Sequence, residues 1–235
     1  MIVPAPPAGH GLLTDKVVLV TAAAGTGIGS ATALRCLQEG ARVVISDRHE
    51  RRLAETATTL AEATGEKPLA VLCDVTDEEQ VRRMVADTVE TFGRLDVLVN
   101  NAGLGGSASV LEMTDEQWSR VLDVTLTGTF RCTRAALRVM AEQRSGVIVN
   151  NASVVGWRAQ RDQAHYAAAK AGVMALTRCA ALDVAHLGIR INAVSPSIAA
   201  HPYLAKTAPA ELLDELAGRE AFGRAAEPWE VANVM

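Results

Sequence analysis

Six short apolar runs, rich in β-branched residues, alternate along this chain with longer segments of helical periodicity. Near-continuous apolar runs are typical of strands covered on both faces, and their alternation with helices is the pattern of βαβ units. We therefore predict one α/β domain, a doubly wound parallel sheet of six to seven strands flanked by helices. The predicted strands cover residues 17–22, 41–47, 69–75, 95–102, 146–153 and 189–197.

The helical segments carry recognisable start and stop signals. Glycines that can end a helix follow three of them, at Gly40, Gly93 and Gly188. Two segments open with a Thr followed three residues later by Glu or Gln, at Thr76–Glu79 and Thr114–Gln117, which predicts a capping box at each. The predicted helices cover residues 28–39, 50–64, 77–92, 115–143, 164–187 and 209–220.

Length and composition indicate how the chain is divided. A chain of 235 residues that is 49% hydrophobic can bury one large core, so we expect a single domain over residues 15–235. Residues 1–14 are rich in Pro and Gly and are expected to form a flexible tail. The chain stops at Glu230–Met235, inside what resembles the start of another helix, so we expect the last strand to be missing from this chain.

The charge pattern and the cysteines exclude several classes of function. A net charge of −4 without basic blocks argues against nucleic acid and anionic membranes as partners. No membrane span or signal peptide is predicted, so we expect a cytoplasmic protein. The four cysteines, Cys36, Cys73, Cys132 and Cys179, lie far apart with no His at ligand spacing. We interpret them as small buried residues in a reducing compartment and predict no metal site.

A glycine-containing turn joins the first predicted strand to the helix after it. The turn includes Gly25, Thr26, Gly27, Ile28 and Gly29. Glycines let the backbone approach a ligand, and free N–H groups at a helix amino end bind a pyrophosphate. The position predicts a dinucleotide site. The common G-x-G-x-x-G spacing is not matched, and a purely conformational turn is the alternative.

Acidic and amide residues follow three further strands at the same edge of the sheet. An acid at Asp47 can accept hydrogen bonds from both ribose hydroxyls and would repel a 2′-phosphate, which favours NAD over NADP. Arg48 and Arg51 can instead pair with such a phosphate, and Asp47 can be a simple turn residue. Asp74 either reaches the cofactor or caps its own loop. Asn100–Gly103 ends the fourth strand at this ligand-binding edge.

A Tyr and a Lys four residues apart open the helix predicted over 164–187. This spacing places the Tyr166 phenol and the Lys170 ammonium on one helix face, where the cation is expected to lower the phenol pKa. Ser153, at the end of the fifth strand, can hydrogen-bond a substrate oxygen as charge develops there. These residue types suit general acid/base chemistry at a carbonyl or alcohol. A surface Tyr and Lys beside a strand-end Ser is the alternative.

Together these residues resemble the classical short-chain dehydrogenase/reductase family, from Lys16 to the last residue. The resemblance implies a single Rossmann-type domain that transfers hydride between NAD(P) and a carbonyl or alcohol carbon. It implies that Tyr166 is the acid/base, that Lys170 lowers its pKa and holds the ribose, and that Ser153 orients the substrate. Further cofactor contacts are implied for Asp74, Val75, Asn101, Ala102, Gly103 and Pro196, on the family motifs Cys73–Val75, Asn100–Gly103 and Ser195-Pro196.

Three departures from the family pattern stand out. The glycine turn is one residue longer and has Ala where the first Gly usually stands, so Gly25 is expected to supply the backbone freedom. Thr125 occupies the place of a fourth catalytic residue, usually Asn, and we expect it to alter a proton relay to Lys170. Pro196-Ser197 replaces the usual Pro-Gly, and the usual cofactor-contacting Thr nearby is replaced within 199–202.

Substrate walls are expected from the loops that follow the strands. An apolar ring or acyl chain can be contacted by Val155, Trp157 and Tyr203, and Arg158 and His201 lie on the same loops. The alternative is that each of these is an ordinary surface or packing residue. Segments 150–158 and 221–229 resemble an actinobacterial-type subgroup of 3-oxoacyl thioester reductases and hydroxysteroid dehydrogenases.

We predict an active secondary alcohol/ketone oxidoreductase on such a substrate; a catalytically weak NAD(H)-binding regulatory protein is the alternative. Helices 115–143 and 164–187 carry wide apolar stripes, and the resemblance implies that such a helix pair forms the interface of a homodimer or homotetramer.

Overall fold

The computed structural model describes residues 3, 5–200 and 210–235. Within these residues one sheet is formed, with six parallel strands in the order β3-β2-β1-β4-β5-β6. The crossover between β3 and β4 makes the sheet doubly wound, as predicted. Each strand is slightly shorter than its apolar run. The strands are β1 (Val17–Val20), β2 (Arg42–Asp47), β3 (Leu69–Leu72), β4 (Val97–Asn100), β5 (Gly146–Asn151) and β6 (Ile189–Val194).

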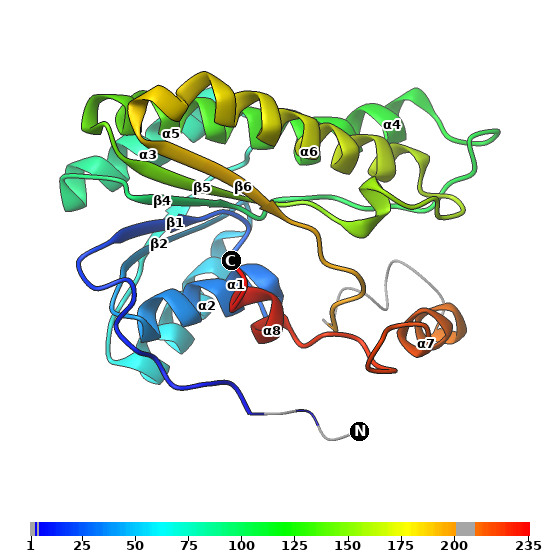
Figure 1. The fold of residues 1–235 in the computed structure, drawn as a ribbon, viewed down its shortest axis with the longest axis horizontal. Helices are drawn as coiled ribbons and strands as arrows, with labels where there is room; N and C mark the ends of the chain where they lie inside the picture. The colour runs from blue at the N-terminus through cyan, green and yellow to red at the C-terminus, as the bar shows by residue number, and fades with distance from the viewer. Residues whose placement is uncertain (1–2, 4, 201–209) are drawn as a thin grey trace.

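Helices cover both faces of the sheet (Figure 1). One face packs against α1 and α2 around buried Val18, Val20 and Ile45, and the short α8 lies on α1. The other face packs against α3, α5 and α6 around Leu19, Leu98 and Ile148. The helices are α1 (Ile28–Gln38), α2 (Glu50–Thr64), α3 (Glu78–Phe92), α4 (Asp115–Leu122), α5 (Gly128–Gln143), α6 (Ala164–Val184), α7 (Ala210–Gly218) and α8 (Pro228–Ala232).

The helix predicted over 115–143 is not continuous. A π-helical segment, Asp123–Thr127, separates α4 from α5. A π-bulge widens the helix by an extra residue per turn and commonly marks a functional site. The apolar periodicity continues through this segment, so the sequence pattern did not reveal it.

Helix caps agree with the sequence at most positions. Thr114 forms the predicted capping box with Gln117. The predicted cap at Thr76 is wrong by one residue, because Asp77 accepts the free backbone N–H groups of Glu79 and Gln80 at the start of α3. A carboxylate also complements the positive end of the helix dipole, which favours Asp over the neighbouring Thr. Gly40, Gly93 and Gly188 all have positive φ, as expected after a helix.

The segment set aside as a tail makes hydrogen bonds to the end of α1. The Glu39 carboxylate accepts the backbone N–H groups of His10 at 2.8 Å and Leu12 at 2.9 Å. Arg35 donates to the carbonyl of Pro7 at 2.7 Å and pairs with Glu39. These contacts did not follow from composition, since they depend on how α1 ends. The flexibility of residues 1–14 stays a prediction.

Three of the four cysteines are buried as predicted, but Cys179 is exposed on α6. Burial raises the pKa of the Cys36 and Cys73 thiols to about 12, which makes them unreactive. Among the described residues, no helix is long and apolar enough to span a membrane, and no cluster of three or more His, Cys, Asp or Glu can hold a metal ion.

Candidate active site

The predicted catalytic residues meet at the carboxyl ends of β4 and β5. Ser153 lies two residues after the end of β5 and precedes a short 3-10 turn, Val154–Gly156, where its hydroxyl accepts the backbone N–H of Val155 at 3.2 Å. Tyr166 lies in the first turn of α6, and Lys170 lies one turn further on. Because β5 and α6 are consecutive elements, the strand end and the helix start are brought to one place.

A hydrogen-bonding interaction with Ser153 acts to lower the pKa of the Tyr166 phenol. The Lys170 Nζ atom lies 5.6 Å from the centroid of the Tyr166 ring. The expected lowering of the phenol pKa is not found in this structure: burial raises the pKa of Tyr166 above 10, and the bond to Ser153 opposes this only in part. The phenol is therefore held as a neutral proton donor.

Lys170 is almost fully buried, with 3% of its surface exposed. Burial lowers the pKa of Lys170 from 10.5 to about 8. Its ammonium donates a hydrogen bond to the backbone carbonyl of Asn151, the last residue of β5. A β-carbon placed on Gly103 would lie 3.5 Å from Lys170 Nζ, so the loop after β4 runs directly beside this group.

Thr125, in the π-helical segment, holds the loop that follows β4 through two hydrogen bonds to Leu104. Its hydroxyl accepts the backbone N–H of Leu104 at 3.0 Å and donates to the carbonyl of the same residue at 3.2 Å. The Thr125 carbonyl accepts the hydroxyl of Thr129 at 2.8 Å. The hydroxyl and the carbonyl of Thr125 thus have protein partners, and its side chain holds Leu104.

The glycine turn has the geometry expected of a ligand loop. Gly25 has a φ of 99°, as the departure from the family pattern required, and Ala22 also has a positive φ of 49°. The backbone N–H of Gly25 donates to Thr56 of α2 at 2.8 Å. Gly27 is the N-cap of α1 and receives no side-chain cap, and Thr26 and Ile28 flank it. Uncapped N–H groups at this helix start remain available to an anion.

Asn101 connects this turn to the neighbouring strands. Its side-chain amide donates to the carbonyls of Thr21 at 3.1 Å and Ala22 at 3.0 Å. The backbone N–H groups of Asn101 and Ala102 both donate to the Thr21 hydroxyl. The segment predicted to contact the cofactor therefore shapes the turn through direct hydrogen bonds.

Asp47 ends β2 with its side chain only 11% exposed. Its carboxylate accepts the backbone N–H of His49 at 2.9 Å and lies 3.9 Å from Arg52. Burial raises the pKa of Asp47, and the charge of Arg52 opposes the shift. Arg48 is exposed, and Arg51 forms an exposed ion pair with Glu55 at 3.5 Å.

The other predicted cofactor residues have structural partners. The Asp74 carboxylate accepts both the backbone N–H and the hydroxyl of Thr76, at 2.9 and 2.8 Å, so it caps its own loop. Val75 is buried in the core beside Gly128. Pro196 accepts the backbone N–H of Val154 at 3.0 Å, which joins the loops after β5 and β6.

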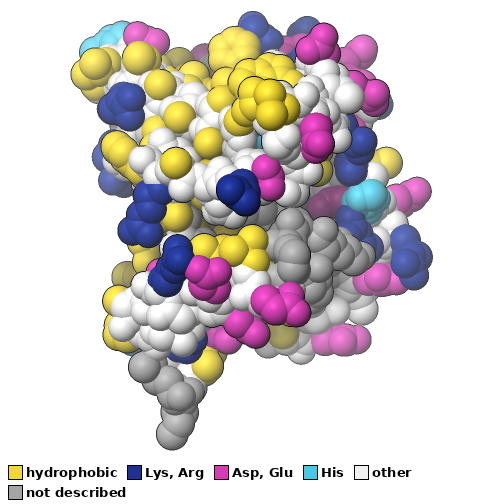
Figure 2. All heavy atoms as spheres, turned by 90° about the vertical axis from the view of Figure 1, so that its right-hand side faces the viewer, with side chains coloured by type: hydrophobic (Ala, Val, Ile, Leu, Met, Phe, Trp, Pro, Cys, Tyr) yellow, Lys and Arg dark blue, Asp and Glu magenta, His cyan; other side chains and the backbone are white. Residues whose placement is uncertain are grey.

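The proposed substrate walls are described only in part. His201 and Tyr203 lie outside the described residues. Trp157 is 72% exposed, Arg158 is exposed and Val155 is half-buried. Figure 2 views the molecule from the side on which α4 and α7 lie in Figure 1: hydrophobic side chains gather at the top of this face, among acidic and basic groups.

His165, which no sequence motif marked, is only 2% exposed. A β-carbon on Gly106 would lie 3.0 Å from its Nε2 atom, and Gln163 donates to the Gly106 carbonyl at 2.6 Å. Burial lowers the pKa of His165 below 6.5. These contacts hold the loop after β4 against the start of α6; the position next to Tyr166 was the only available signal.

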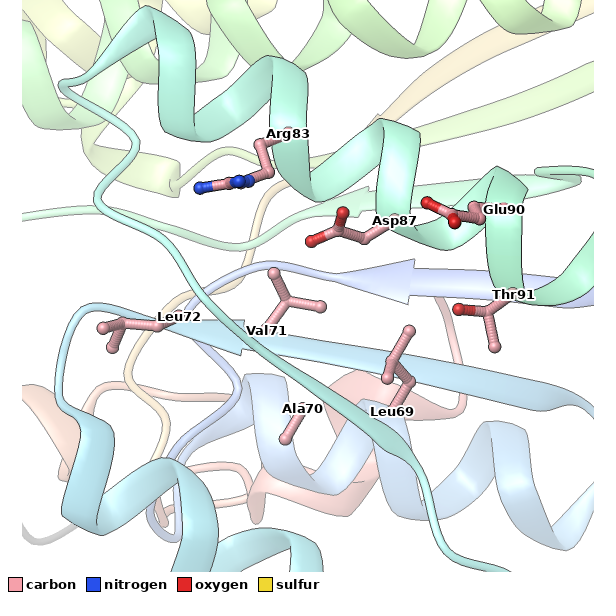
Figure 3. Close-up of a pocket in the computed structure, with 8 residues that line it drawn as sticks. All are labelled: Leu69, Ala70, Val71, Leu72, Arg83, Asp87, Glu90 and Thr91. Carbon is pink, nitrogen blue, oxygen red and sulfur yellow. The ribbon is translucent and has the colours of Figure 1, made fainter.

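A separate hollow of about 470 Å³ lies along β3 and α3 at the outer edge of the sheet (Figure 3). None of the predicted site residues lines it. Its walls are the four residues of β3 with Arg83, Asp87, Glu90 and Thr91 of α3.

A doubly wound sheet with a glycine turn at one strand end and a Ser–Tyr pair beside a buried Lys defines a dinucleotide-dependent oxidoreductase. Residues 22–235 match the family model described as Enoyl-(Acyl carrier protein) reductase. The chain belongs to the short-chain dehydrogenase/reductase family, whose members act on CH–OH groups with a nicotinamide cofactor.

Two comparisons show close similarity to mycobacterial proteins. The chain is 67% identical over 226 residues to (5R,7aS)-5-hydroxy-7a-methyl-1-oxo-2,3,5,6,7,7a-hexahydro-1H-indene-carboxyl-CoA reductase of Mycobacterium tuberculosis, covering 96% of this chain and 86% of the relative. The crystal structure of a short chain dehydrogenase from Mycobacterium smegmatis superposes with a TM-score of 0.87 at 61% identity, covering 98% of this chain and 88% of the other.

Solved structures with either nicotinamide cofactor have the same fold. NAD⁺-bound xylitol dehydrogenase gives a TM-score of 0.89 at 34% identity, covering 94% of this chain and 91% of the other. A variant of actinorhodin polyketide ketoreductase with NADPH gives 0.86 at 37% identity, covering 93% and 88%. The fold alone therefore does not select between the two cofactors.

Proposed function

We propose that this protein is an NAD-dependent oxidoreductase that interconverts a secondary alcohol and a ketone, with Tyr166 as the general acid/base. The observation that carries the proposal is that the buried Lys170 ammonium lies 5.6 Å from the centroid of the Tyr166 ring, with Ser153 acting on the same phenol. A neutral, half-buried phenol can donate its proton to a developing alkoxide, and the Ser153 hydroxyl can orient the same oxygen. The nicotinamide supplies the hydride chemistry when bound.

Lys170 is the cation that stabilises the ionised phenol in this proposal. With a pKa near 8 it is positively charged at neutral pH. A cation within about 6 Å favours the phenolate, so the ammonium held beside the Tyr166 ring promotes proton release from the phenol. Thr125 has its hydroxyl and its backbone carbonyl hydrogen-bonded within the protein. We assign it a role in holding the loop at Leu104.

We further propose that the substrate is a coenzyme A thioester of an alicyclic carboxylic acid that carries the reacting alcohol or ketone on its ring. The 67% identical relative is named as a reductase of such a compound. Trp157 and Val155 offer apolar surface for a ring, and the exposed Arg158 can meet a phosphate of the carrier.

We propose NAD as the preferred cofactor. Asp47 places a largely buried carboxylate at the end of β2, where ribose hydroxyls are bound in dinucleotide folds. Its negative charge opposes a 2′-phosphate, and Arg51 is already paired with Glu55. Asn101, Ala102 and Gly103, with the turn from Gly25 to Gly29, would form the rest of the cofactor site.

The test is a substrate panel assayed with NADH and NADPH side by side. It contains ring ketones as free acids and as coenzyme A thioesters, and the wild type is compared with Tyr166→Phe. We expect turnover of the thioesters with NADH, a loss of about 10²–10⁴-fold in Tyr166→Phe, and nearly unchanged NADH binding. Undiminished turnover in Tyr166→Phe would refute the acid/base assignment, and turnover of the free acids alone would refute the thioester class.

We also propose a homodimer or homotetramer formed through helices 115–143 and 164–187. An exposed apolar stripe runs along α6 at spacings of three and four residues. Trp118 of α4 and Phe130 of α5 are each 40% exposed as well. A continuous apolar helix surface of this kind is typical of a subunit interface. The stripe consists of Ala168, Ala171, Ala175, Cys179 and Leu182.

A further inference from the structure

Asn151 has contacts on both its backbone and its side chain that concern the active site. Its backbone carbonyl accepts the hydrogen bond from the Lys170 ammonium. Its side-chain Nδ2 donates to the Oδ1 atom of Asn101 at 2.9 Å. Since Asn101 directly follows β4 and Asn151 ends β5, the two amides form a bridge across the carboxyl edge of the sheet.

The bridge continues to the predicted cofactor turn. The other end of the Asn101 amide donates to the carbonyls of Thr21 and Ala22. A β-carbon on Gly29 would lie 2.5 Å from Asn101 Nδ2, so this amide also packs directly against the start of α1. The turn is therefore connected to Lys170 through the hydrogen bonds of both amides and the covalent link between the Asn151 side chain and its backbone carbonyl.

The Asn151 side chain has an unpaired buried oxygen that destabilises the fold, which argues against a purely structural role. Three apolar residues, Val147 to Val149, precede the asparagines in the same strand. The Oδ1 atom of Asn151 is buried and has no hydrogen-bond partner among the described residues. An unpaired buried carbonyl oxygen is destabilising, and an apolar side chain here would avoid it.

We propose that Asn151 is a positioning residue, which fixes the Lys170 ammonium relative to the cofactor turn through its amide bridge to Asn101. The inference rests on the proposed roles of Tyr166 and Lys170. Burial alone accounts for the lowered pKa of Lys170, and the Tyr166 phenol is the titratable group beside it. The effect of this ammonium on Tyr166 thus depends on where Asn151 holds it.

The test compares Asn151→Leu with wild type in alcohol oxidation, measured as kcat and kcat/KM from pH 6 to 10. Leu has a similar size but cannot bridge to Asn101, so Lys170 is held less firmly and the phenolate is less stabilised. We expect the apparent pKa of the acidic limb of the profile to increase by about 0.5–1 unit, so that kcat at pH 7 is reduced about three- to tenfold. The KM for substrate stays nearly constant.

Asn151→Asp provides a second, independent measurement. An ionised carboxylate would face the Oδ1 atom of Asn101 and force this amide to turn away from Thr21 and Ala22. We expect the dissociation constant of NAD⁺, measured by titration calorimetry, to rise about tenfold. The control is Asn192→Leu on the neighbouring strand β6, where the side chain is exposed; its pH profile and NAD⁺ binding should match wild type.

The outcomes separate this inference from the proposed function. If Tyr166→Phe abolishes turnover while Asn151→Leu keeps the wild-type pH limb, the positioning role is refuted and the proposed function stands. A lowered thermal midpoint in Asn151→Leu with an unchanged pH limb would show a merely structural role. If Tyr166→Phe keeps full turnover, the proposed function fails, and the Asn151 inference falls with it.

Discussion

Gly29 and Asn101 are packed so closely that a β-carbon on residue 29 would lie 2.5 Å from the Asn101 Nδ2 atom and 2.5 Å from the Ala22 carbonyl oxygen. The start of α1 is thereby pressed against both the turn and the end of β4. Backbone atoms cannot yield as a flexible side chain can, so we expect Gly29→Ala to lower the free energy of unfolding by about 1–3 kcal/mol.

Gly27 is the matched control for this prediction. It lies two residues earlier in the same turn, and a β-carbon there meets nothing within 4 Å. We expect Gly27→Ala to change the free energy of unfolding by less than about 0.5 kcal/mol in urea denaturation without cofactor. Equal destabilisation by the two variants would show that helix packing at Gly29 is not the cause.

Lys170 should make stability depend on pH in a defined window. Its pKa is about 8 in the folded protein and 10.5 ordinarily. Between these values the unfolded chain binds more protons, so stability from this group rises as pH increases from 8 to 10.5. We expect wild type to gain up to about 3 kcal/mol in free energy of unfolding relative to Lys170→Met across this window.

Urea denaturation of both proteins at several pH values between 7.5 and 10 would measure this difference. Other titrating groups are common to both chains and cancel in the comparison. Lys16→Met is the control, because Lys16 is exposed, and its difference from wild type should stay constant with pH. A flat difference for Lys170→Met as well would mean that the ammonium is hydrated in the folded protein.

Asp47 should determine the choice of cofactor. Asp47→Ser removes the carboxylate but keeps a hydroxyl for hydrogen bonding, so repulsion of a 2′-phosphate is lost. We expect the ratio of kcat/KM for NADPH to that for NADH to increase about 10–100-fold. Arg48→Ala in the same background shows whether Arg48 binds the phosphate, in which case part of the gain disappears. Wild-type turnover with NADPH equal to that with NADH would contradict the role of Asp47.

The order of elements and the meeting of Ser153 with Tyr166 and Lys170 followed from the sequence, because apolar runs and helix periodicity fix which ends share an edge of the sheet. The finer contacts did not. Asn151 stands at the end of an apolar strand, and nothing in its neighbourhood marks the bridge to a residue 50 positions earlier.

The π-helical segment at Thr125 illustrates the same limit. Its backbone geometry depends on packing between α4, α6 and the loop at Leu104, whereas periodicity reports only which face is apolar. The state of the Tyr166 phenol is a further case, since i,i+4 spacing places the Lys170 side chain nearby but does not decide which acceptor its ammonium takes.

Leu182 tests the proposed assembly, because it is 80% exposed at the end of the apolar stripe on α6. A charge there would have to be buried without a partner in a subunit interface, at a cost of several kcal/mol. We expect Leu182→Lys to shift the protein toward monomers in sedimentation velocity at micromolar concentration. Leu12→Lys is the matched control, since Leu12 is 74% exposed in the N-terminal segment, away from these helices. If both variants sediment as wild type, the stripe is a free surface and the interface lies elsewhere.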